Sequence, residues 1–207
     1  KRHWFEIVPA VPAGLAHVVR YWDKAATADD GDYTVGLLMA WRSGVYYVLD
    51  VVRGQWDGEA RDRVIRQTAA LDAGRFGDVQ IWVEQEPGSA GVDAAKSFIR
   101  MLAGYPAYAE RVSGKGNKPV RAEPFQAQAM VGNVKLLHGP WNKPYLDALA
   151  AFPSGAHDDE VDASSGAFRR VSIRRDLAAV EEASDTPATG AQRYVTERGA
   201  LPVRGRL

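Results

Sequence analysis

The sequence contains no cysteine, which excludes a disulfide framework, thiolate zinc sites and cysteine nucleophiles. It also lacks any apolar run near the roughly 20 residues that a membrane-spanning helix needs, and no signal-like segment follows its first residues. Neither sign of charge is in excess, because 26 lysine and arginine residues balance 26 aspartate and glutamate residues. Any nucleic-acid surface must therefore be a local patch, and a soluble, intracellular protein without a membrane partner is expected.

The 207 residues, of which 46% are hydrophobic, suffice for one medium-sized domain with a substantial core. The opening residues begin without methionine or a helix cap, which suggests a fragment of a longer polypeptide. We predict a linker remnant at 1–16, a folded domain at 17–184 and a flexible basic tail at 185–207. The tail carries four arginines among few apolar residues: Arg193, Arg198, Arg204 and Arg206.

Hydrophobic periodicity predicts an α/β domain. Strands are predicted where β-branched and aromatic residues cluster: 17–22, 33–41, 45–52, 79–86, 107–112 and, shorter, 134–137. Helices are predicted where apolar residues recur at helical spacing: 57–73, 92–103, 121–130, 145–152, and from 158 to 170 or beyond. Asp57 is the expected cap of the first helix and Gly74 its stop, and Arg42-Ser43-Gly44 reads as a hairpin turn. The order of the first elements is therefore β-β-β-α-β-α-β.

Acidic residues fall where this order of elements would bring them together. Asp23 ends the first strand, Glu84 lies near the end of the fourth, and Asp158 with Asp159 opens the last helix. If the first and fourth strands are neighbours, the carboxylates at their ends converge, and a helix packed across that edge adds a third group. Such carboxylates repel one another unless a hard cation neutralises them, and oxygen-only ligation suits Mg²⁺ or Mn²⁺. A pair of these ions roughly 3.5–4 Å apart supports in-line phosphoryl displacement, which is nuclease chemistry.

Each acidic residue also has a structural interpretation. Asp23 alone is compatible with a simple strand end, and carboxylates such as Asp158 and Asp159 commonly supply negative charge to a helix N-terminus. Glu84 and Glu86 share one face of their strand, and Glu84 is preferred because it lies deeper. Weaker candidates stand beside the aspartate pair: Asp162, one helical turn on, and His157.

A basic segment without acidic residues runs from Arg111 to Arg121, loosened by glycines. Lys115, Lys118 and Arg121 are candidate DNA contacts, because such a loop can bind phosphates; the alternative is an ordinary solvated connection. Residues 91–97 end in Lys-Ser like a phosphate-binding loop but carry alanine where its glycine must be, so ATP hydrolysis is not expected.

Several stretches resemble one known family. They are RYWDKAA at 20–26 with DYT at 32–34, VEQEPGSAG at 83–91, KPVRAEP at 118–124, GNV at 132–134 and FPSGAHDDEVDA at 152–163. In this order they cover roughly residues 17–170 and resemble the C-terminal nuclease domain of the large terminase subunit of tailed bacteriophages. The resemblance implies an RNase H-like fold, a mixed five-stranded sheet flanked by helices, here with extra C-terminal helices. This agrees with the order of elements derived from the residues themselves.

The resemblance also implies a function. Members of this family pair an N-terminal packaging ATPase with a nuclease that cuts double-stranded viral DNA during genome packaging. Residues 1–16 would then be the remnant of a linker from the ATPase domain. The implied partners are DNA, the portal protein and the small terminase subunit, the implied location is the host cell cytoplasm, and the isolated domain is expected to be monomeric.

Carried over by position, the resemblance implies that Asp23 bridges two Mg²⁺ or Mn²⁺ ions, with Glu84 and the pair Asp158 and Asp159 as outer ligands. Lys118 and Arg121 would position the DNA backbone. A departure lies at position 117, because many relatives carry an acid where this sequence has asparagine, so contacts of this loop are expected to differ.

Two other functions fit the residues. One is a different RNase H-like nuclease, such as a junction resolvase or transposase, which would prefer branched or transposon-end DNA. The other is a docking module without catalysis, in which the tail from Arg193 to Arg206 contacts the portal or small subunit. Deleting residues 185–207 would abolish partner binding but leave DNA cutting intact if both roles coexist.

Overall fold

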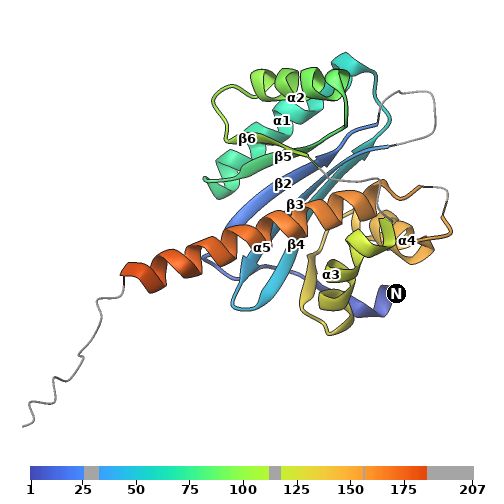
Figure 1. Cartoon of the computed structure of the whole chain (residues 1–207). Coiled ribbons are helices and arrows are strands. Elements are labelled where there is room, and N and C mark those ends of the chain that lie inside the picture. The colour runs from blue at the N-terminus through green and yellow to red at the C-terminus, as the bar shows by residue number, and fades with distance from the viewer. Residues whose placement is uncertain (26–32, 112–117, 156, 186–207) are drawn as a thin grey trace, which may run out of the picture.

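The computed structural model describes residues 1–25, 33–111, 118–155 and 157–185, with side chains of the last helix described up to residue 177. One seven-stranded sheet has the order β1-β7-β4-β3-β2-β5-β6 and carries helices on both faces (Figure 1). The strands are β1 (Glu6–Val8), β2 (Ala16–Asp23), β3 (Thr34–Arg42), β4 (Val45–Gly54), β5 (Gln80–Gln85), β6 (Ala107–Arg111) and β7 (Val134–Leu137). The helices are the 3₁₀ turn η1 (Arg2–Trp4), α1 (Gly58–Phe76), α2 (Ser89–Met101), α3 (Lys118–Met130), α4 (Asn142–Ala151) and α5 (Asp159–Asp185).

The predicted order β-β-β-α-β-α-β is confirmed by the run from β2 to β6. The predicted five-stranded sheet is too narrow, however. The short strand predicted at 134–137 joins the sheet as β7 beside β4, and β1 pairs with β7 from within the stretch assigned to a linker. A strand of only three residues leaves almost no pattern in a sequence, which is why β1 was missed. The assignment of residues 1–16 to a linker stays a prediction, as does the tail, whose residues 186–207 lie outside the described part.

Local sequence explains the connections. The predicted hairpin is confirmed, with Arg42 paired to Val45 and positive φ at Ser43 (49°) and Gly44 (87°), as a tight two-residue turn requires. Asp57 caps α1 as expected, since its side chain accepts a hydrogen bond from the Ala60 amide at 2.8 Å. The helix continues to Phe76, two residues beyond the stop predicted at position 74, because one internal glycine costs only about 1 kcal/mol.

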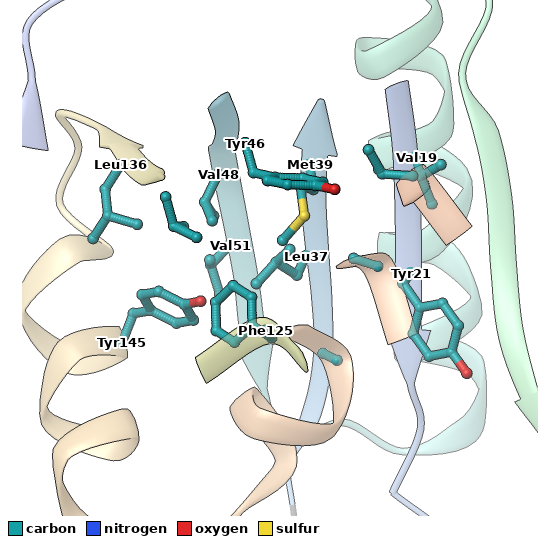
Figure 2. Close-up of a cluster of buried hydrophobic side chains, with 14 of the residues drawn as sticks. Val19, Tyr21, Leu37, Met39, Tyr46, Val48, Val51, Phe125, Leu136 and Tyr145 are labelled. Atoms are coloured by element: carbon teal, nitrogen blue, oxygen red, sulfur yellow. The ribbon is translucent and has the colours of Figure 1, made fainter. Parts of the chain in front are cut away.

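Successive side chains of β2 point to opposite faces of the sheet, and each face has its own hydrophobic cluster. Val19 and Tyr21 belong to the cluster that lies under α3, α4 and α5, and Figure 2 shows it closing between sheet residues such as Leu37 and helix residues such as Phe125 and Tyr145. On the other face, a second cluster lies under α1 and α2: Trp22, Ile65, Ala69, Ile81, Val83, Phe98 and Leu102. The next residue of β2, Asp23, therefore points to the face that α5 crosses.

A buried ion cluster lies on the opposite face of the same strand. The side chain of Arg20 is only 1% exposed; its Nε donates to Asp72 at 2.7 Å, and its Nη groups donate to Asp50 at 2.8 Å and to the Gly36 carbonyl at 2.9 Å. Burial opposes the charge of Arg20, but the two carboxylates outweigh it and raise its pKa. This guanidinium joins β2, β3, β4 and α1.

None of the helices in the described part of the chain has the length and apolarity that crossing a lipid bilayer demands.

Candidate active site

Strand order sets two carboxylates side by side. β2 and β5 are parallel neighbours, as predicted for the first and fourth strands, and Trp22 pairs with Val83. The following residues, Asp23 and Glu84, are thus adjacent at the carboxyl ends of the two strands. Both point to the face covered by α5, because the residues before them belong to the cluster on the other face.

Helix α5 adds further carboxylates to this edge. Burial raises the pKa of the Asp23 carboxyl well above its usual value, and three negative neighbours raise it further: Asp162, Asp159 and Glu84. Asp159 and Asp162 are three residues apart and lie on one side of α5. That side is fixed by Gly166, where a Cβ atom would come within 2.3 Å of the Tyr21 ring. The close approach at Gly166 thus turns Asp159 and Asp162 toward the end of β2.

Asp158 lies differently. It precedes α5, its carbonyl accepts the amides of Val161 and Asp162, and its carboxylate accepts a hydrogen bond from Lys118 Nζ at 2.7 Å. It is not among the charges that contribute most to the raised pKa of Asp23. The structure therefore brings together Asp23, Glu84 and Asp159 of the predicted ligands with the weaker candidate Asp162, and it puts Asp158 at the rim.

Two cations of α3 pair with these acids. Lys118 Nζ lies 2.9 Å from Asp162 Oδ2, while Arg121 reaches Asp162 Oδ1 at 3.0 Å and Glu84 Oε2 at 3.5 Å. Burial opposes the charge of Lys118, but the hydrogen bonds that Lys118 donates to Asp158 and Asp162 outweigh this effect and raise its pKa. These predicted DNA-contacting residues thus neutralise carboxylates here, and their contact with DNA stays a prediction. The third such residue, Lys115, lies outside the described residues together with Asn117.

The two cations do not compensate all of the negative charge. Burial raises the pKa of Glu84; Arg121 lowers it, and Asp162 raises it again, with a net increase. The pKa of Asp23 is also raised. Burial therefore disfavours the ionised forms of both carboxyl groups, and at Asp23 the neighbouring acids add to its effect.

The carboxylate oxygens are ligands of the type that a hard divalent ion prefers, but their present positions do not form a complete coordination site. Among the described side chains, no three histidine, aspartate or glutamate residues are grouped to hold an ion. Lys118 and Arg121 occupy oxygens of Asp158, Asp162 and Glu84 in this arrangement. All available donors are oxygens, which Mg²⁺ and Mn²⁺ prefer, and an ion would relieve the repulsion that raises the pKa of Asp23.

A network that the sequence did not reveal anchors Asp159. The backbone amide of Tyr33 donates to Asp159 Oδ2 at 3.2 Å, and the Arg53 guanidinium lies 3.2 Å from the centroid of the Tyr33 ring. Arg53 Nε also lies 2.5 Å from Oε1 of the buried Glu160. His157, considered as a ligand or loop residue, packs edge-on against Tyr33 at 5.1 Å. β4 thereby fixes the first turn of α5, through contacts that no local sequence pattern signals.

A pocket of about 290 Å³ opens beside the carboxylates. It is lined by Asp23, Lys24, Ala25, Arg61, Glu84, Glu86, Ala90, Gly91, Ala94 and Ala95. Glu86, whose role the sequence left open, is exposed just beyond the end of β5. Burial, followed by the nearby charge of Arg61, lowers the pKa of Lys24. The pocket thus has an acidic wall and a basic wall.

Known structures share this fold. The human cytomegalovirus terminase nuclease domain, Mn-soaked with inhibitor bound, is 14% identical, with a TM-score of 0.62 over 85% of this chain and 95% of that one. The large terminase nuclease of the thermophilic phage G20c with bound zinc is 14% identical, with a TM-score of 0.59 over 81% and 95%. The Thermus phage P74-26 large terminase nuclease domain is 13% identical, with a TM-score of 0.55 over 81% and 91%. The RNase H-like fold predicted from the sequence is therefore confirmed.

Among curated proteins, no sequence matches this one. A family model described as the terminase RNaseH-like domain matches residues 20–170. The match begins three residues before Asp23 and contains the carboxyl end of β2, all of β5 with Glu84, and the acidic start of α5. The chain belongs to the family of terminase RNaseH-like domains.

Proposed function

We propose that the chain is the nuclease domain of a large terminase subunit, an endonuclease that cuts double-stranded DNA during viral genome packaging and depends on Mg²⁺ or Mn²⁺. The observation that carries the proposal is the convergence of Glu84, Asp159 and Asp162 on Asp23, whose pKa is raised by burial and further by these three acids. Acidic side chains that lie close together despite their mutual repulsion indicate a site in which a ligand supplies positive charge. Family membership supports DNA as the substrate.

The residues divide the work by position. Asp23 is the proposed shared ligand, because it interacts with the other three carboxylates. Glu84 would hold one side from β5, and Asp159, with Asp158 or Asp162, would hold the other from α5. Two bound Mg²⁺ or Mn²⁺ ions would supply an activated water and stabilise the leaving oxygen of the phosphodiester. The hydrogen bond from the Tyr33 amide orients Asp159 before any ion binds.

Lys118 and Arg121 supply the contact with the substrate backbone in this proposal. Both lie within ion-pair distance of the carboxylates, so a strand whose phosphate reaches the acids also reaches these cations. Once ions neutralise the carboxylates, the two side chains can exchange a carboxylate for a phosphate. Phosphate contacts carry no base information, which fits cutting with little sequence preference.

The Asp23→Ala variant tests the proposal. Nicking of supercoiled plasmid with Mn²⁺ is expected to fall more than about 100-fold, because even residues that only support ligands cost 10–100-fold when changed. Mn²⁺ is also expected to stabilise the unmodified protein against heat, by about 2.7 kcal/mol at 100 times its Kd, and not to stabilise Asp23→Ala. Asp147→Ala, which changes an exposed carboxylate on α4, is the control. Equal cutting by Asp23→Ala and Asp147→Ala would refute the proposal.

The alternatives give different results. A junction resolvase or transposase would favour branched or transposon-end DNA over a linear duplex in a substrate panel. A docking module would bind portal protein or small terminase subunit without cutting. Binding of these partners and work in the host cell cytoplasm remain part of the proposal, as does a role for residues 185–207 in docking.

A further inference from the structure

The basic wall of the pocket beside Asp23 takes no part in the proposed ion chemistry. It is formed by Lys24 at the end of β2 and Arg61 on α1, and the small residues of α2 close the space opposite. At about 290 Å³, the pocket is near the lower end of the roughly 300–1,000 Å³ of small-ligand sites. There is therefore room for more than an ion beside the carboxylates.

Among the described residues, neither cation of this wall has a carboxylate within hydrogen-bond distance. Lys24 Nζ lies 5.4 Å from the centroid of the Phe98 ring and has no ion pair with any acid of the described residues. Arg61 donates through Nη1 to the Ala25 carbonyl at 2.9 Å, but its buried Nε has no hydrogen-bond acceptor within the described structure. The carboxylate nearest to that Nε belongs to Asp62, at 3.7 Å. Lys118, in contrast, has two carboxylates within 3 Å.

The opposite wall packs closely against the chain after β5. Gly91 lies so near the chain after β5 that a Cβ atom there would come within 2.1 Å of the Glu86 carbonyl oxygen. The first turn of α2 has no side-chain cap, since Gly88 occupies the cap position. The unpaired amides expected in the first turn of a helix give this end of α2 a partial positive charge.

We infer that this pocket is a subsite for a backbone phosphate of the DNA strand, beside the phosphate at the carboxylates. The inference rests on the proposed function, because Asp23 and Glu84 would repel a phosphate until ions neutralise them. With that repulsion removed, Lys24 and Arg61 face the phosphate together, opposed by the exposed Glu86 at the rim. The subsite therefore binds DNA after the ions and without preference for base sequence.

A purely structural role of the two cations makes a different prediction. Arg61 donates to the carbonyl of Ala25, and Lys24 Nζ lies over the Phe98 ring, so in that case their loss would lower only stability. A phosphate contact instead releases counterions from DNA. The slope of log affinity against log salt is negative, and each lost contact makes it less negative by about 0.9 for duplex DNA.

Lys24→Gln is the decisive variant. Binding of a fluorescent 20-base-pair duplex would be followed by anisotropy over a series of salt concentrations in Ca²⁺, a hard ion with the same oxygen preference, and the duplex checked for integrity afterwards. The Kd is expected to rise about tenfold, the scale of one charge-assisted hydrogen bond. The slope of log affinity against log salt is expected to become less negative by about 0.9. Lys24→Arg should restore the slope, and Arg66→Gln, on an exposed position of the same helix as Arg61, should leave both quantities unchanged.

An unchanged slope in a folded Lys24→Gln protein would overturn the subsite. Mn²⁺ binding, measured without DNA by calorimetry, should remain within about twofold of the unmodified protein, because a phosphate contact does not hold the ion. Failure of the proposed function looks different: the unmodified protein would then neither bind Mn²⁺ nor cut plasmid. A slope that becomes less negative only together with loss of Mn²⁺ binding would assign Lys24 to the ion site and also contradict the subsite.

Discussion

Two charged clusters lie three residues apart on β2 and face opposite sides of the sheet. Around Arg20, the guanidinium donates to Asp72, Asp50 and a carbonyl, so each carboxylate of this cluster has a hydrogen bond from a positive group. Around Asp23, burial raises the pKa of the carboxyl, and the acids of β5 and α5 raise it further. One strand therefore carries a compensated cluster and an uncompensated one.

The difference separates structural charge from functional charge. A buried charge that only supports the fold must find its partners within the protein, because an unpaired one costs several kcal/mol. A group of acids whose mutual repulsion is not neutralised within the protein indicates that a bound ligand supplies the positive charge. The number of charged residues does not distinguish the two clusters. They differ in whether each charged group lies beside groups of opposite sign or beside groups of the same sign.

Breaking the compensated cluster should have the largest effect on stability. Arg20→Met leaves Asp72 buried without its partner and is expected to lower the free energy of unfolding by about 3–5 kcal/mol, measured by urea denaturation. The double variant Arg20→Met with Asp72→Leu should recover part of the loss, because it removes the stranded charge. A loss below about 1 kcal/mol for Arg20→Met would place this cluster with weak surface pairs instead.

The uncompensated cluster should respond with the opposite sign. Because the pKa of Asp23 is raised in the folded state, its protonated form is favoured there, and stability falls as pH rises from the unfolded pKa through the folded one. Asp23→Asn should therefore raise the melting temperature of the metal-free protein at pH 8, with about 2–4 °C for each 1 kcal/mol. The gain should vanish below the unfolded pKa. Asp93→Asn, at an exposed position of α2, is the control, and a lower melting temperature for Asp23→Asn at pH 8 would contradict this account.

The smallest effect is expected at the rim. Lys118 pairs with Asp158 and Asp162, but its side chain is 46% exposed, so Lys118→Met should destabilise the metal-free protein by less than about 1 kcal/mol. Saturating Mn²⁺ should shrink that loss further, because the ion then neutralises the same carboxylates. Thermal melts with and without Mn²⁺ would measure both values, and Lys96→Met serves as a surface control. A loss that grows with Mn²⁺ would mean that Lys118 and the ion cooperate.

Periodicity and order of elements predicted much of this architecture. The alternation of side chains along β2 and the pairing of β2 with β5 were enough to predict that Asp23 lies beside Glu84. The choice between Asp158 and Asp162 could not be made, because it depends on which side of α5 meets the sheet. That side is set by the contact of Gly166 with Tyr21, a packing detail between residues 145 positions apart in sequence.

Other features depend equally on distant residues. Arg53 and Glu160 pair across more than 100 positions, and each alone reads as an ordinary solvated charge. The site at which β7 enters the sheet depends on a parallel match with β4, which periodicity cannot specify. Sequence patterns thus located the acids that end a strand, whereas tertiary packing determined which helical acids join them.

The outermost strands of the sheet have a consequence for solubility. β1 spans three residues and β6 five, whereas β4 between them spans ten. Each outer strand also bears an exposed charged residue, Glu6 on β1 and Arg111 on β6. Short, charged borders offer few unpaired amides for a second chain to extend, so a broad sheet can stay protected from edge-to-edge aggregation.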